Sequence, residues 1–191
     1  MTKIAVVVGS TRDGSFNKML GELAVASLVA QGADVTRVDL STFDLPLYSA
    51  ALEAGAFPAD ALRLKGILAA QDGHIYVSPE YNGSLPPLLK NAIDWASRPT
   101  GDEGLVALTA YRGKVAAIMS ASLSPFGGLR ALLHLRQILS TIQMLVIPEQ
   151  VAIPAAYAAF DEQGALKDAL PASLVDITTA RLIAVAKALA A

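Results

Sequence analysis

The stretch that decides the fold runs from residue 78 to residue 95 and reads Ser78-Pro79-Glu80-Tyr81-Asn82-Gly83-Ser84-Leu85-Pro86-Pro87-Leu88-Leu89-Lys90-Asn91-Ala92-Ile93-Asp94-Trp95. An apolar run, residues 74–77, ends just before Ser78, and a helical pattern follows the turn residues almost at once. Gly83 permits backbone conformations that other residues resist. Ser84 suits the N-cap, and the two prolines suit a first helical turn. The stretch predicts a tight strand-to-helix elbow whose free backbone N–H groups can bind a flat ring with polar edges.

A second informative segment lies near the start of the chain. The short apolar run Lys3–Val8 is followed by Gly9-Ser10-Thr11-Arg12-Asp13-Gly14-Ser15-Phe16-Asn17 and then by a long helical pattern. Hydroxyls, one guanidinium and a helix N-terminus are what a phosphate monoester needs, which makes candidates of Ser10, Arg12, Ser15 and Asn17. The segment is not a Walker loop, because it does not end in Gly-Lys-Ser/Thr, and the spacing of Gly9 and Gly14 does not fit the dinucleotide fingerprint. The alternative is an ordinary polar turn in which Ser15 caps the next helix.

Short β-branched runs alternate with helical patterns along the whole chain. We expect strands at Ile4–Val8, Val35–Asp39, Gly73–Ser78, Lys114–Ser120 and Met144–Ile147. We expect helices at about Ser15–Ala30, Ala59–Ala70, Pro86–Trp95, Gly128–Ile142 and Ala172–Ala191. Continuous apolar strands that alternate with helices predict an α/β fold with a parallel sheet covered on both faces. Neither a repeat nor a linker interrupts the pattern, so we assign residues 1–191 to one domain.

Composition excludes several classes of protein. The chain of 191 residues has no cysteine, so it has neither disulfides nor a thiolate nucleophile. Its two histidines, His74 and His134, are far apart, which argues against a histidine-rich metal site. A net charge of −2 without a basic stripe argues against nucleic-acid binding. No signal peptide and no apolar run of membrane-spanning length is evident, so we expect a cytoplasmic protein without a membrane partner.

The two motifs, Gly-Ser-Thr-Arg-x-x-Ser-x-Asn and Ser-Pro-Glu-Tyr-Asn-x-Ser-x-Pro, resemble those of the NADPH-dependent FMN reductase family, which includes quinone and chromate reductases. The resemblance covers nearly the whole chain and implies a flavodoxin-like, doubly wound, five-stranded parallel sheet. It implies FMN as the cofactor and NADPH or NADH as the co-substrate. It also places the isoalloxazine ring against Pro79, Glu80, Tyr81, Asn82 and Gly83. Glu80 is a poor neighbour for reduced flavin, so we expect it to point away or to fix the loop.

A third segment, Ser120–Arg130, follows the fourth strand and contains the Gly127-Gly128-Leu129-Arg130 run that the family carries. Ser120 is our candidate here for a contact with the flavin or its ribityl chain, and a loop that only caps the next helix is the alternative. The glycine-containing stretch Pro99–Gly113 is also expected to border the site. The helix Gly128–Ile142 has apolar residues outside a single stripe, which indicates either a wide core face or a subunit contact. Family members commonly form dimers or tetramers, which favours a homo-oligomer.

The chain lacks the nucleophile motif of a hydrolase. Hydride transfer through a flavin needs few side chains, because the cofactor performs the chemistry. We therefore predict an FMN-dependent NAD(P)H oxidoreductase that works by a ping-pong mechanism. Family acceptors are quinones, chromate, azo compounds and free flavin, so we expect a small-molecule partner. Two alternatives stay open: a reductase that releases FMNH2 to a partner monooxygenase, and a non-enzymatic FMN electron carrier or sensor.

Overall fold

A computed structural model describes residues 1–190. Its five strands form one parallel sheet in the order β2-β1-β3-β4-β5. Their bounds are β1 Lys3–Val8, β2 Asp34–Asp39, β3 Gly73–Val77, β4 Val115–Ala121 and β5 Leu145–Ile153. This order is that of the flavodoxin-like doubly wound fold. The predicted fold class and all five strands are confirmed.

The last strand is longer than the sequence predicts. We expected Met144–Ile147, whereas β5 continues to Ile153 through Pro148, Glu149 and Gln150. The register with β4 shifts between Ala116 and Ile118, so a bulge falls beside the proline. Proline cannot donate to a ladder, and a bulge on an edge strand is where a sheet tolerates it. The polar and proline-containing middle of β5 interrupts the apolar pattern, so the sequence did not predict the second half of the strand.

All five predicted helices are present within residues 1–190, and three short helical segments were missed; Ala191, the predicted end of the last helix, lies outside the described residues. The predicted helices are α1 Phe16–Ala30, α3 Ala59–Ala69, α4 Pro87–Ala96, α5 Leu129–Thr141 and α7 Ala169–Leu189. The missed segments are the 3-10 turn Leu40–Thr42, α2 Ala50–Gly55 and α6 Ala156–Ala159. Segments of three to six residues are too short to show a helical period in the sequence.

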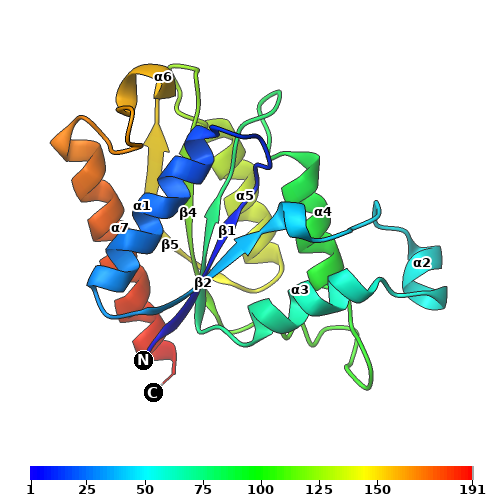
Figure 1. Cartoon of the computed structure of the whole chain (residues 1–191). Helices are drawn as coiled ribbons and strands as arrows, with labels where there is room; N and C mark the ends of the chain where they lie inside the picture. Colours follow the sequence, from blue (N-terminus) through cyan, green and yellow to red (C-terminus); the bar gives the residue numbers. More distant parts are fainter. Residues whose placement is uncertain (191) are drawn as a thin grey trace.

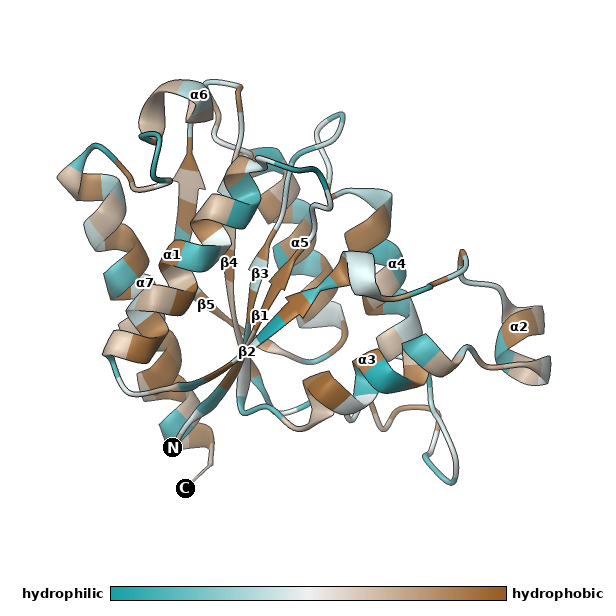
Figure 2. Ribbon diagram, in the orientation of Figure 1, coloured by the Kyte–Doolittle hydropathy of each residue, from teal (hydrophilic) through white to brown (hydrophobic). Residues whose placement is uncertain are grey.

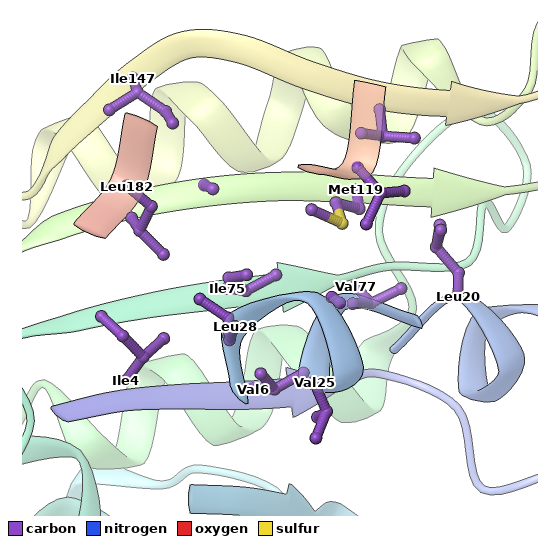
Figure 3. Packing of buried hydrophobic residues seen from close by; sticks show 14 of the residues in the cluster. Ile4, Val6, Leu20, Val25, Leu28, Ile75, Val77, Met119, Ile147 and Leu182 are labelled. Carbon is purple, nitrogen blue, oxygen red and sulfur yellow. The ribbon is translucent and has the colours of Figure 1, made fainter. Parts of the chain in front are cut away.

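The helices cover both faces of the sheet. Figure 1 shows α1 and α7 on one side of the sheet and α4 and α5 on the other. Side chains alternate along β1, so Ile4 and Val6 enter the core under α1 and α7, while Ala5 and Val7 face the opposite core. Figure 3 shows the first of these cores, with residues of α1 and α7 packed on β1, β3, β4 and β5. Figure 2 shows that the central strands are mainly hydrophobic, as strands buried on both faces must be.

The parallel sheet brings three loops to one edge. Each loop starts where a strand ends: residues 9–15 after β1, residues 78–86 after β3 and residues 122–128 after β4. The carboxyl ends of neighbouring parallel strands meet at the same edge, which is where ligands of this fold bind.

The expectation that Pro99–Gly113 borders the site is wrong. This segment follows α4, which returns the chain to the amino ends of the strands, and it leads into β4. The buried Lys65 of α3 holds it there, since the ammonium group donates to Arg98 O at 2.7 Å and to Thr100 Oγ1 at 3.0 Å and pairs with Glu103. The segment thus closes the opposite end of the sheet.

Helix α7 is long and apolar enough to cross a membrane by length and composition, and it is the one such helix among residues 1–190. In the fold, however, Val175, Leu182, Ile183 and Ala186 of α7 lie in the core. Ser27 of α1 also donates to the Asp176 carboxylate at 2.5 Å. One face of the helix therefore packs in the core of this domain.

Candidate active site at the carboxyl edge of the sheet

The three loops enclose a cavity of about 680 Å³. Small-molecule sites typically have volumes of about 300–1,000 Å³. Its lining is made of Ser10, Arg12, Ser15, Phe16, Asn17, Pro79, Glu80, Tyr81, Asn82, Gly83, Ala121, Ser122, Leu123, Ser124 and Arg130. Nine of the ten predicted site residues are in this list, and Ser120 is the exception. The fold thus brings both sequence motifs to one cavity.

The first loop offers a cation and two hydroxyls to the cavity. Gly9 N–H donates to Val77 O at 2.8 Å and ties the loop to β3. A Cβ at Gly9 would lie 3.1 Å from Leu89 of α4, so the backbone passes close to that helix. Within the described part of the chain, the Arg12 guanidinium has no ion pair, and the Ser10 and Ser15 hydroxyls have no hydrogen-bond partner. Three donors next to the N-terminus of α1 can hold an anion.

Asn17 connects two elements that border the cavity. Its Nδ2 donates to Ala121 O at 2.8 Å, and its Oδ1 accepts from Ala121 N–H at 2.9 Å. One amide N–H and the amide oxygen are therefore bound to the backbone at the end of β4. The side chain joins the first turn of α1 to the end of β4 in the wall of the cavity, and its second N–H has no partner among the described residues.

The elbow is a turn that precedes the helix. Tyr81 and Ser84 exchange two backbone hydrogen bonds, of 2.8 and 3.0 Å, across Asn82 and Gly83. The φ angles of Asn82 and Gly83 are +50° and +81°. Positive φ at both central positions is the geometry of a type I′ turn, for which Asn-Gly is the preferred sequence. The expected positive φ at Gly83 is confirmed.

The predicted N-cap at Ser84 is wrong, because α4 begins at Pro87 with Pro86 as its N-cap. Ser84 instead closes the turn, and its hydroxyl lies 2.9 Å from His134 Nδ1 of α5. Among residues 1–190, the backbone N–H groups of Glu80, Asn82 and Gly83 have no hydrogen-bond acceptor. The free backbone N–H donors that we expected at the start of the helix therefore lie in the turn that precedes it.

Glu80 lines the cavity, but its carboxylate is bound by α5, which corresponds to the second of our two expectations, that it fixes the loop. Its carboxylate accepts from Arg130 Nε at 2.8 Å, from Arg130 Nη2, and from Ala131 N–H at 3.4 Å. The Glu80 side chain is only 4% exposed, whereas that of Arg130 is 54% exposed. The elbow is thus attached to the N-terminal turn of α5.

Ser120 lies beneath the cavity and does not line it. Alternation along β4 turns its side chain toward α5, on the face that also holds Ala116 and Ile118. A Cβ at Gly128 would overlap the Ser120 hydroxyl, so Gly128 must pack directly on it. The fully buried Ser120 hydroxyl has no hydrogen-bond partner in the described residues.

Sequence reasoning did not name several lining residues in the third loop and in the elements next to it. They are Ala121, Ser122, Leu123, Ser124 and Arg130, together with Phe16 of α1. The signal was present, since all but Phe16 lie in the Ser-Gly-rich segment Ser120–Arg130 that follows β4. Residues 1–190 contain no cluster of three or more His, Cys, Asp or Glu side chains that could hold a metal ion.

Comparison with known proteins agrees with this geometry. The family model described as NADPH-dependent FMN reductase matches residues 2–158. An NAD(P)H-dependent FMN reductase of Pseudomonas aeruginosa is 38% identical over 167 residues, which cover 87% of this chain and 85% of that protein. A 2-hydroxy-1,4-benzoquinone reductase of a Burkholderia species is 40% identical over 160 residues, covering 84% of this chain and 80% of the relative.

Solved structures give the same result. The flavoenzyme NAD(P)H:(acceptor) oxidoreductase of Paracoccus denitrificans superimposes with a TM-score of 0.82 and 29% identity, and the match covers 98% of both chains. The sequence motifs and the overall fold agree with this similarity. The chain therefore belongs to the NADPH-dependent FMN reductase family.

Proposed function

We propose that residues 1–191 form one domain that binds FMN in the cavity at the carboxyl edge of the sheet and transfers reducing equivalents from NADPH or NADH to quinones. One observation carries this proposal: a single cavity joins a loop with a free cation and free hydroxyls to a turn with free backbone N–H groups. A phosphate ester with a planar, polar-edged ring matches both ends of that cavity.

The first loop would hold the phosphate. Arg12 supplies a charge-assisted donor, and Ser10 and Ser15 supply neutral donors. The N-terminus of α1 adds a favourable field for an anion. Asn17 keeps this loop in register with the third loop through its two bonds to Ala121.

The elbow would hold the ring. When bound, FMN supplies the hydride chemistry. The chain's part is to orient the ring with the N–H groups of Glu80, Asn82 and Gly83 and to leave one of its sides accessible. Tyr81 and Leu123 are more than half exposed at the mouth of the cavity, so the mouth is open to solvent. Donor and acceptor would use the open side in turn, which is the basis for a ping-pong mechanism.

Relatives support quinones as the acceptor. The proteins that share 36–40% identity with this chain include several quinone reductases, among them those of Pseudomonas putida and Escherichia coli. A planar, small oxidant fits a site that must also accept a nicotinamide ring. Chromate, azo compounds and free flavin are the further acceptors that we expect from the family.

The test is spectroscopic. The purified protein should be yellow, and NADPH added without oxygen should bleach the flavin, whose colour then returns on addition of menadione. A colourless protein that oxidises NADPH only when FMN is supplied would favour release of FMNH2 to a partner monooxygenase. A yellow protein that NADPH and NADH both leave oxidised would favour the electron carrier or sensor and would refute the proposal.

We also propose a cytoplasmic homo-oligomer, either a dimer or a tetramer. In α5, Ala131, Leu132, Leu135 and Leu139 are buried against the rest of the domain. Leu129 and Leu133 of the same helix are 38% and 57% exposed. A groove of about 620 Å³ runs between α4 and α5, lined by Ser84, Leu85, Pro87, Lys90, Asp94, His134, Gln137, Ile138, Thr141 and Ile142. These exposed apolar positions support a subunit contact on α5.

A further inference from the structure

Helix α5 has no capping side chain at its own N-cap residue, and the elbow supplies a hydrogen-bond acceptor for its first turn. Its N-cap is Gly128, at φ +85°, which has no side chain to accept from the first free N–H groups. Ala131 is the third residue of the helix, and its N–H donates to the Glu80 carboxylate at 3.4 Å. A carboxylate at this position satisfies a free donor and lies at the positive end of the helix dipole. Glu80 therefore acts as a capping residue supplied from another loop.

The same face of α5 holds the other end of the turn. His134 Nδ1 lies 2.9 Å from Ser84 Oγ. Arg130 and His134 are four residues apart and thus share one face of the helix. Arg130 contacts Glu80 before the turn, and His134 contacts Ser84 after it. The four residues of the turn are consequently attached to α5 at both ends.

The ion pair also determines the charge beside the elbow. Glu80 is nearly buried, and its main charged partner is Arg130. The N–H groups of Asn82 and Gly83 lie two and three residues further along the chain. An unpaired carboxylate here would oppose the negative charge that reduced FMN carries, whereas an unpaired guanidinium would favour it.

We infer that Glu80 and Arg130 are positioning residues: their pair orients the Pro79–Ser84 elbow against the flavin ring and keeps the charge next to the ring near zero. The inference rests on the proposed binding of FMN in this cavity. Neither residue takes part in bond making: the pair acts through the position of the turn's backbone donors and through the charge beside them.

The experiment uses Glu80→Gln and Arg130→Gln, compared with Glu22→Gln as a control. Glu22 pairs with Arg37 at 3.1 Å in an exposed ion pair on α1 and β2, outside the cavity lining. Fluorescence titration of the apoproteins should show about tenfold weaker FMN binding for each of the two site variants, because an elbow that is no longer fixed must be ordered when FMN binds. The double variant should lose little more than either single one, because both substitutions break the same pair.

The reduction potential of bound FMN separates positioning from simple structural support. Arg130→Gln leaves the Glu80 carboxylate unpaired and should shift the potential to more negative values. Glu80→Gln leaves the guanidinium unpaired and should shift it to more positive values. A tenfold change in the relative affinity for the two redox states corresponds to about 30 mV for a two-electron couple. Shifts of the same sign, or equal potentials in all variants, would overturn the charge assignment.

Hydrogen exchange in the apoprotein tests the attachment without FMN. Peptides that cover residues 80–84 and 129–133 should exchange faster in both site variants than in wild type, while Glu22→Gln should leave them unchanged. Unaltered exchange together with wild-type FMN affinity would refute the inference. If the wild-type apoprotein binds no FMN, the proposed function fails, and the exchange measurement still decides whether the pair fixes the elbow.

Discussion

Gly83→Ala should weaken FMN binding through backbone strain alone. Gly83 has φ +81°, and a Cβ built there would meet only Arg130 Cδ, at 4.0 Å. That distance is an ordinary van der Waals contact, so the substitution creates no clash. The remaining cost is that of an L-residue with positive φ, about 1–2 kcal/mol.

This cost can appear in two places, and both can be measured. If the turn relaxes in the apoprotein and must be restored on binding, FMN affinity falls about five- to thirtyfold. If the turn keeps its geometry, the free energy of unfolding falls instead, offset in part because alanine also restricts the unfolded chain. Fluorescence titration and urea unfolding of the same preparation give both quantities. We expect the sum of the two losses to be about 1–2 kcal/mol.

Gly32 provides a matched control. It has φ +79° after α1, and no atom lies within 4 Å of a Cβ built there. Gly32→Ala therefore carries the same strain and the same unfolded-state term far from the cavity, and it should leave FMN affinity unchanged. Gly83→Asn should restore most of the lost affinity, because asparagine tolerates positive φ. Equal FMN affinity and stability for Gly83→Ala and wild type would refute the reasoning, as would an equal loss of affinity in Gly32→Ala.

Three further predictions concern other parts of the molecule. Arg12→Ala should weaken FMN binding about ten- to a hundredfold, the contribution of a charged hydrogen bond, and an unchanged dissociation constant would remove Arg12 from the phosphate site. Burial lowers the pKa of His74 from 6.5 to about 4, so the fold favours neutral His74, and its contribution to stability is present above pH 6.5 and lost as the pH falls toward 4. Between pH 7 and pH 5 the free energy of unfolding should fall by about 2 kcal/mol through His74. In urea unfolding, the free energy of unfolding of His74→Gln should therefore depend less on pH than that of wild type, and an equal pH dependence of the two would contradict this prediction. Light scattering should give a mass at least twice 19.8 kDa, which Leu133→Lys should reduce, whereas a monomeric wild type at micromolar concentration would refute the oligomer.

The position of the site could be predicted from the sequence because it depends on order along the chain. Buried parallel strands show as continuous apolar runs, and each of the two motifs directly follows such a run. The topology then brings their loops to one edge of the sheet. Asn82-Gly83 also encodes its turn locally, since only a few residue types accept positive φ at both central positions.

The side-chain roles could not be predicted because they depend on distant partners. Asn17 is held by Ala121, which is 104 residues away in the sequence. Glu80 is paired with Arg130, 50 residues away. Ser120 was assigned to the cavity because it begins the Ser-Gly-rich segment after the fourth strand, yet it still lies in β4, where one position along the strand turns the side chain to the other face of the sheet. Its burial under Gly128 follows from how the third loop folds back, which no local pattern encodes.

The error at Pro99–Gly113 has a different cause, and topology alone could have prevented it. In a sheet of parallel strands, every loop from a strand to a helix lies at the carboxyl edge, and every loop from a helix to a strand lies at the opposite edge. Residues 99–113 lead from α4 to β4 and so belong to the second class, however rich in glycine they are. The same reasoning applied to residues 122–128, which lead from β4 to α5, would have added Ser122 and Ser124 to the site candidates, because the direction of a connection determines the edge at which its loop lies, whatever its composition.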